Sequence, residues 1–153
     1  MVCSGSFVLL APPRKLNEVQ GALRLDSQQN VLLSVPAQPE FLRVVRVAAS
    51  GLASRLGFSI DEVDDLRLAL DELCFTLIAK GPNDGTIALK YVLNTDRLTI
   101  EGTSKLDDGR ESSPVGNLSQ QILTALVDEH RIWDEGNTSF FTLTKCRSAR
   151  TTN

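Results

Sequence analysis

The clearest pattern along the chain is an apolar stripe with the period of a helix near its middle. Five apolar residues recur there at steps of 3, 4, 3 and 4, namely Val63, Leu66, Leu70, Leu73 and Leu77. These steps keep the side chains on one face of a helix with about 3.6 residues per turn. Ser59 stands three residues before Glu62, as in a capping box, and Gly81-Pro82 follows as a stop. The pattern predicts a helix from Ser59 to about Lys80.

Weaker patterns predict two more helices, a first strand and two hairpins. A stripe that begins at Phe41 predicts a helix that starts near Pro39 and closes at Gly57 with a glycine cap. A third stripe, from Leu118 to Val127, predicts a short helix. Turn residues bound the β-prone runs. The expected strands are Val31–Val35, Thr86–Leu93 with Arg97–Thr103, and Arg131–Trp133 with Thr138–Thr144.

The order of these elements is strand, helix, helix, hairpin, helix, hairpin. It predicts an α/β (α+β) two-layer sandwich, in which three helices cover one face of a mixed, mostly antiparallel sheet. The length of 153 residues fits one domain. We expect a weakly ordered N-terminal extension at 1–29, a single domain at 30–146 and a C-terminal tail at 147–153.

Composition and net charge argue against several classes of function. The net charge is −3 with no basic block, which argues against direct binding of nucleic acid. No apolar run approaches the roughly 20 residues of a membrane span, and Arg14 and Lys15 follow the apolar run 7–11, unlike a secretory signal. The 3 cysteines are scattered and suit reduced thiols, so we predict a cytoplasmic protein. With His130 as the single histidine, a zinc site built on a His pair is hard to form.

Three stretches resemble a known family: 35–53, Leu56-Gly57-Phe58, and the run Asp64 to Cys74 in the central helix. They look like the anti-sigma factors that are also serine-protein kinases, of the sigma-B and sporulation type. That family belongs to the Bergerat-fold ATPases, together with histidine-kinase catalytic domains. The phrase Leu123 to Glu129 adds to the resemblance, which spans about residues 31–146.

The resemblance implies partner switching in the control of bacterial transcription, in a stress response. Such a protein binds a sigma factor and keeps it from RNA polymerase, and an anti-anti-sigma factor competes for it. Arg43 and Arg46 share a face of the first predicted helix and would contact acidic groups of the sigma factor. Ordinary surface charge is the other interpretation of these two arginines. Homodimers of the family pair through a sheet edge, for which Val31–Val35 is the candidate here.

The family also implies a nucleotide site, on a Glu and an Asn four residues apart in the second helix. Glu72 matches the Glu, which would act as general base, and Thr76 takes the position of the Asn that holds Mg²⁺. Without the resemblance, Glu72 would be a solvated charge and Thr76 a packing or surface residue. The family's Asp-x-Gly-x-Gly motif for adenine falls on Gly102, Ser104 and Leu106, so all three positions differ.

The third nucleotide element is a glycine-rich turn that cradles phosphate at the start of the third helix, and here it keeps only Gly116. The sequence therefore predicts a degenerate ATP and Mg²⁺ site built on Glu72, Thr76, Gly102 and Gly116. The main prediction is an anti-sigma factor that acts by binding. The alternative is an active serine/threonine-protein kinase that phosphorylates its anti-anti-sigma partner with ATP.

Overall fold

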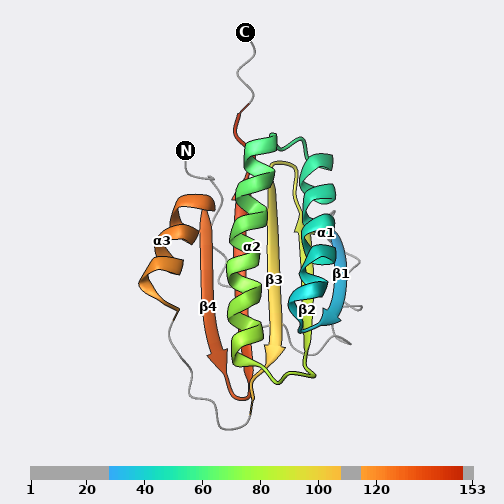
Figure 1. The fold of residues 1–153 in the computed structure, drawn as a ribbon. Coiled ribbons are helices and arrows are strands. Elements are labelled where there is room, and N and C mark those ends of the chain that lie inside the picture. The colour runs from blue at the N-terminus through green and yellow to red at the C-terminus, as the bar shows by residue number, and fades with distance from the viewer. Residues whose placement is uncertain (1–27, 108–114, 150–153) are drawn as a thin grey trace.

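The strands of the described residues form one antiparallel sheet in the order β1-β2-β3-β5-β4. The computed structural model describes residues 28–107 and 115–149 (Figure 1). Its strands are β1 (Gln29–Pro36), β2 (Thr86–Leu93), β3 (Arg97–Lys105), β4 (Glu129–Glu135) and β5 (Thr138–Cys146). Its helices are α1 (Leu42–Arg55), α2 (Ile60–Lys80) and α3 (Asn117–Leu126), with a short 3-10 turn, η1 (Pro39–Phe41), before α1.

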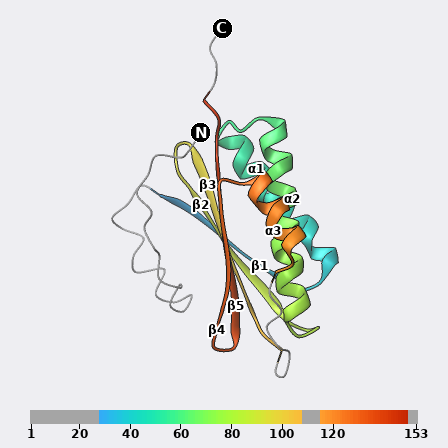
Figure 2. The same cartoon turned by 90° about the vertical axis from the view of Figure 1, so that its left-hand side faces the viewer.

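The helices lie on one face of the sheet, as Figure 2 shows in side view. The predicted two-layer α+β sandwich is therefore confirmed. One detail was wrong, because the sheet was expected to be mixed and every pairing among the described strands is antiparallel. No helix among these residues is long and apolar enough to cross a membrane.

Helix α2 packs along the middle of the sheet (Figure 1). Its predicted start is confirmed, because the Ser59 side chain accepts from the Glu62 N–H while the Glu62 carboxylate accepts from the Ser59 N–H. Leu66, Leu70 and Leu73 of the predicted stripe are fully buried. Burying one such leucine side chain contributes about 1.5–3 kcal/mol, so this stripe dominates the attachment of α2.

The other helices are held less extensively. Helix α1 rests on β2, where the buried Tyr91 hydroxyl donates to the Val45 carbonyl at 3.1 Å. Helix α3 buries one residue, Leu123. The predicted bounds of these elements were close, but β3 continues past Thr103 to Lys105 because this segment pairs with Thr138–Phe140 of β5.

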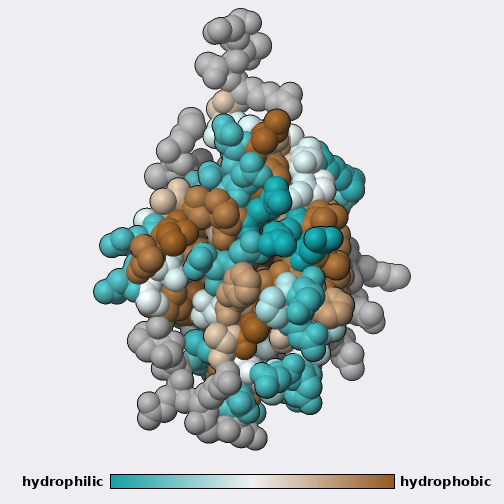
Figure 3. Space-filling view, viewed as in Figure 1, coloured by the Kyte–Doolittle hydropathy of each residue, from teal (hydrophilic) through white to brown (hydrophobic). Residues whose placement is uncertain are grey.

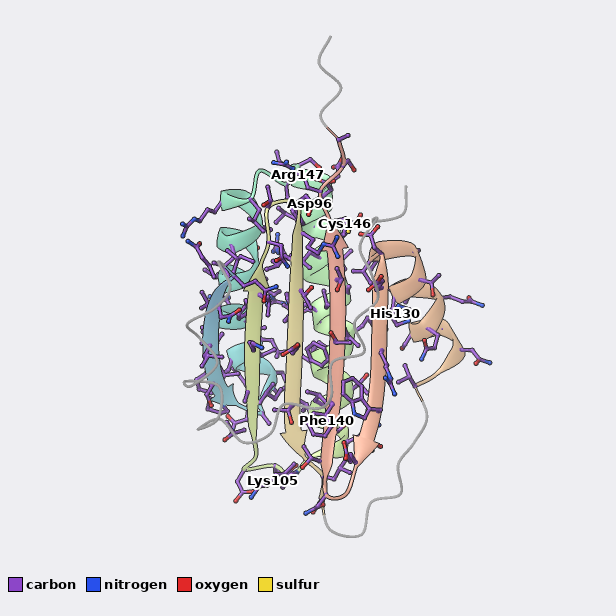
Figure 4. All side chains as sticks on the ribbon, turned by 180° about the vertical axis from the view of Figure 1, so that it is seen from behind. Asp96, Lys105, His130, Phe140, Cys146 and Arg147 are labelled. Carbon is purple, nitrogen blue, oxygen red and sulfur yellow. The ribbon has the colours of Figure 1, made fainter. Side chains whose placement is uncertain are left out.

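The sheet has two edge strands, β1 and β4. The expectation that the first strand lies at an edge is confirmed, and Val31 and Leu32 on it are exposed. At the opposite edge, Trp133 of β4 stacks on Phe140 of β5 with ring centroids 5.4 Å apart, and the Arg131 guanidinium lies 4.9 Å from the Trp133 ring. Phe141 next to Phe140 is buried against the helices, so this stack lies on the face without helices, which Figure 4 views directly.

After β5, residues 147 and 148 form hydrogen bonds with the rest of the domain that the sequence did not predict. Arg147 donates from its N–H to the Asp96 carbonyl at 2.7 Å and from its guanidinium to the Leu56 carbonyl at 3.0 Å (Figure 4). The Ser148 N–H donates to the Glu62 carboxylate at 2.6 Å. These contacts attach residues 147 and 148 to the turn between β2 and β3, to the end of α1 and to the start of α2. The extension at 1–27 and the tail at 150–153 lie outside the described residues.

The cysteines differ from the expectation in one respect. Cys74 is free and buried in α2, and burial raises the pKa of its thiol far above the ordinary value of 9.0. A buried thiol of this kind is an inert core residue. Cys146 is disulfide-bonded, so the expectation of a reduced thiol is wrong at this position.

Candidate functional site

The predicted site begins with Glu72, which lies half-buried on the outer side of α2. Its Oε2 accepts a hydrogen bond from the Ser119 hydroxyl of α3 at 3.1 Å. This contact links α2 to the first turn of α3, whose N-cap is Gly116. The structure thus brings Glu72 close to the start of α3, as the nucleotide-site pattern requires.

Thr76 lies one turn further along α2, as the four-residue spacing predicted. Its hydroxyl donates to the Glu72 carbonyl at 2.8 Å and so completes a bond within the helix. The pair would offer a magnesium ion one hydroxyl and one carboxylate that already accepts from Ser119. That donor set is a poor fit for Mg²⁺, which favours carboxylates, phosphates and water in a near-octahedral shell. Among the described residues, no group of three or more His, Cys, Asp and Glu could hold a metal ion.

Gly102 stands at the position of the adenine-binding Asp and faces the buried ring of Phe141. The two residues are paired in register between β3 and β5. A Cβ added at Gly102 would overlap the Phe141 ring, and that ring is 1% exposed. Interiors are close-packed, so any side chain here would have to displace the ring. Phe141 therefore fills the space that a side chain at this position would need, and the site does not fit adenine as the family pattern requires.

A buried polar cluster fills the neighbouring end of β3. Lys80, at the end of α2, pairs with Asp134 of β4 at 3.0 Å, and the Ser139 hydroxyl donates to Asp134 at 2.6 Å. The side chains of Lys80 and Asp134 are only 11% and 16% exposed. Ser104, the second motif position, is buried beside Ser139 in the strand register. This cluster was not predicted from the sequence, because Asp134 was expected to lie in a turn.

Two positions of the predicted nucleotide site remain, Leu106 of the adenine motif and Gly116 of the phosphate turn. The Leu106 N–H donates to the Asn137 carbonyl at 3.0 Å, which joins the end of β3 to the turn between β4 and β5. A Cβ added at Gly116 would meet no atom within 4 Å, and its φ is −58°. A glycine is therefore not required there by space or by backbone conformation, which favours an ordinary turn over a phosphate cradle.

Helix α1 presents the predicted basic face. Arg43 and Arg46 line one groove of about 470 Å³, together with Val47, Arg67 of α2 and small residues of α1. The Arg46 guanidinium is fixed by Asp71 of α2 at 2.8 Å, and Val47 is 66% exposed. The prediction that the two arginines share a face is confirmed. Figure 3 shows this helical face, on which hydrophobic side chains lie among hydrophilic ones.

A second cavity, of about 610 Å³, lies at the turn between β2 and β3 and is lined by Asn94, Asp96 and Arg97 among others. Glu72, Thr76, Gly102 and Gly116 line neither this cavity nor the α1 groove. The predicted nucleotide residues are thus divided between a helix–helix contact at Glu72 and a filled core at Gly102.

Comparison with known proteins identifies the family. The serine-protein kinase RsbW of Bacillus subtilis is 31% identical over 120 residues, which cover 65% of this chain and 75% of that protein. The serine-protein kinase RsbW of Listeria monocytogenes is 29% identical over 127 residues, covering 69% of this chain and 81% of that protein. No protein-family model matches the chain.

A solved structure supports the fold alone. The RsbU and RsbW domains of Rv1364c from Mycobacterium tuberculosis superpose with a TM-score of 0.63 at 20% identity. The match covers 82% of this chain, and the chain spans 35% of that longer one.

The antiparallel sheet, covered on one face by α1, α2 and α3, has the fold of that solved structure. Because the relative from Bacillus subtilis is 31% identical and the match covers 75% of that protein, this chain belongs to the RsbW serine-protein kinase family. The resemblance found in the sequence is confirmed.

Proposed function

We propose that this chain is an anti-sigma factor that sequesters a sigma factor by protein–protein binding. An anti-anti-sigma factor relieves the sequestration by competing for the same protein, as partner switching in a bacterial stress response. The observation that carries the proposal is the groove on α1. It combines Arg46, which is fixed by Asp71, with the exposed Arg43 and Val47.

The groove suits an acidic segment with an apolar residue. A guanidinium offers five N–H donors in a planar fork, and Asp71 takes one donor of Arg46 in the structure. The bond to Asp71 holds the side chain in place, so little rotamer entropy remains to be lost on binding. Carboxylates of a sigma factor would meet Arg43 and Arg46, while Val47 would contact an apolar side chain.

Charge reversal in the groove tests this proposal. Arg46→Glu places a carboxylate beside Asp71, and we expect binding to the cognate sigma factor from a panel of the host's sigma factors to weaken at least tenfold. Arg55→Glu is the control, since Arg55 lies at the exposed end of the same helix, outside the groove. Equal affinities of the two variants by biolayer interferometry would refute the groove as the sigma-binding surface.

The ATP site of the proposed anti-sigma factor is degenerate and weak. Supporting observations are the Phe141 ring behind Gly102 and the internal bond of the Thr76 hydroxyl. A titration with a fluorescent ATP analogue and Mg²⁺ checks this proposal. Micromolar affinity would contradict it.

The alternative function is a serine/threonine-protein kinase acting on the anti-anti-sigma partner. Glu72 favours it, because the general-base carboxylate of the family is kept, and the relatives are named serine-protein kinases. Incubation of the protein with labelled ATP and the anti-anti-sigma partner distinguishes the two functions. Phosphate transfer that disappears in Glu72→Ala would establish the kinase.

We also propose a homodimer through the β1 edge, located in the cytoplasm and without direct contact to nucleic acid or membrane. The edge offers Val31 and Leu32, and Phe41 and Val44 before and on α1 are exposed as well. An open strand edge with exposed apolar residues favours pairing with another chain. Size-exclusion chromatography with light scattering should give a dimer, and Leu32→Lys should give a monomer.

A further inference from the structure

Glu72 is the retained carboxylate of the nucleotide-site pattern, and it already has a partner within the chain. Its Oε2 accepts from the Ser119 hydroxyl in the first turn of α3. That helix has Gly116 as its N-cap and no side-chain cap. Free N–H groups give the start of a helix partial positive charge, which favours a nearby carboxylate. Glu72 therefore supplies an anion at the start of α3 from the protein itself.

Among the described residues, α3 has few other attachments, one of which is the partly buried Leu126 packed against the core. Leu123 is its one buried residue, and Leu118 in its first turn is 70% exposed. At the far end of the helix, Lys145 donates to the Leu126 carbonyl at 2.7 Å. An exposed bond joins Gln120 to His130. The start of α3 therefore depends on the contact between Ser119 and Glu72 more than a well-buried helix would.

The bond of Thr76 points to the same role for Glu72. The Thr76 hydroxyl donates to the Glu72 backbone carbonyl, so the two side chains do not converge on one point as a magnesium pair would. We propose that Glu72 is a positioning residue, which holds α3 against α2 without nucleotide. This inference extends the proposed function and rests on its statement that the ATP site is degenerate.

Hydrogen exchange of the full chain tests the proposal at the amides from Gln120 to Val127. Gln120 donates to the Gly116 carbonyl and Val127 to the Leu123 carbonyl, so both report on α3 itself. In Glu72→Ala these amides should exchange roughly fivefold to tenfold faster, as expected for loss of a half-exposed, charge-assisted hydrogen bond. Amides of β2 and β3 should keep their rates.

Further variants separate the contact from a general loss of stability. Ser119→Ala should reproduce the effect, and the double variant with Glu72→Ala should be no worse than either single variant, because one contact is removed once. Glu72→Gln keeps an acceptor without the charge and should fall between Glu72→Ala and the natural protein. Asp61→Ala, on the exposed start of the same helix, should leave α3 unchanged.

Magnesium ATP separates failure of this inference from failure of the proposed function. Hydrogen exchange of the α3 amides in the natural protein should be equally fast with and without magnesium ATP. Unchanged exchange in both Glu72→Ala and Ser119→Ala would overturn the inference and leave the anti-sigma function standing, as would a uniform increase over all elements. Slower exchange of α3 on addition of magnesium ATP would overturn both the inference and the degenerate site.

Discussion

The two halves of α2 face opposite kinds of surroundings. Its first half, with Arg67, borders the open groove of α1, where charged side chains reach solvent. Its last turn carries Lys80, whose side chain is little exposed and pairs with Asp134, which also accepts from the Ser139 hydroxyl. In this chain the arginine groove lies open on the helical layer, whereas the Phe141 ring occupies the space that a side chain at residue 102 would need. The difference teaches that one helix can border an open polar groove at one end and a packed interior at the other.

The largest effect on the free energy of unfolding is expected when the aspartate of the family's adenine motif is placed at residue 102. Gly102→Asp would force a charged side chain into the Phe141 ring, and the combined cost of overpacking and of a buried, unpaired charge is at least about 3 kcal/mol. Urea denaturation would measure the loss, or the variant would fail to fold. Adding Phe141→Ala should recover part of the loss. If Gly102→Asp left the free energy of unfolding unchanged, the space beside Gly102 would be open, contrary to this prediction.

Removing Lys80 should have the next largest effect. Lys80→Ala removes the ammonium group that lies 3.0 Å from the Asp134 carboxylate in a little-exposed pair, which costs about 2–3 kcal/mol. The midpoint of urea denaturation should fall accordingly. Lys80→Ala combined with Asp134→Ala should be less destabilised than the sum of the two single variants. Additive losses would argue against the pair as a unit.

Acidification should weaken the start of α2 through Glu62. Burial raises the pKa of the Glu62 carboxyl, but hydrogen bonds from Ser148 and Ser59 outweigh burial and leave that pKa below the ordinary value of 4.5. The carboxylate therefore adds stability that is present above pH 4.5 and is lost as the pH falls through the folded pKa.

Thermal melts between pH 7 and pH 3 would measure this dependence. In Glu62→Gln the dependence should be flatter than in the natural protein, whereas Glu129→Gln, on the exposed start of β4, should leave it unchanged. Identical pH profiles of the natural protein and Glu62→Gln would contradict the assignment.

The smallest effect is expected in the groove. Arg67 pairs with Asp64 at 2.9 Å, but the two side chains are 47% and 56% exposed, so the pair is screened by solvent. Arg67→Ala should change the free energy of unfolding by no more than about 0.5 kcal/mol. A loss as large as that of Lys80→Ala would remove the contrast between the two halves of α2.

Local signals made much of the fold predictable. The capping box at Ser59 and Glu62 and the leucine stripe of α2 depend on neighbours within a few residues, and both were found. The shared face of Arg43 and Arg46 follows from the same periodicity. The sequence therefore predicted the helical layer and the surface that it offers.

The features that the sequence did not predict depend on contacts between segments far apart in the chain. Phe141 opposes Gly102 only because β5 pairs with β3 in one register, and nothing local to either residue specifies it. The separate pairing of β4 with β5 extends β4 and places Asp134 in a strand rather than a turn. Glu62 was understood as part of a helix start, while its bond to Ser148 spans 86 positions of the chain.

Trp133, the single tryptophan of the chain, gives the molecule a built-in optical reporter. It stacks on Phe140 on the side of the sheet turned away from the helices. A partner bound in the α1 groove should leave its emission spectrum unaltered, whereas any molecule that binds on the face of Trp133 and Phe140 should shift or quench it. One fluorescence titration can therefore tell on which side of this protein an unknown ligand sits.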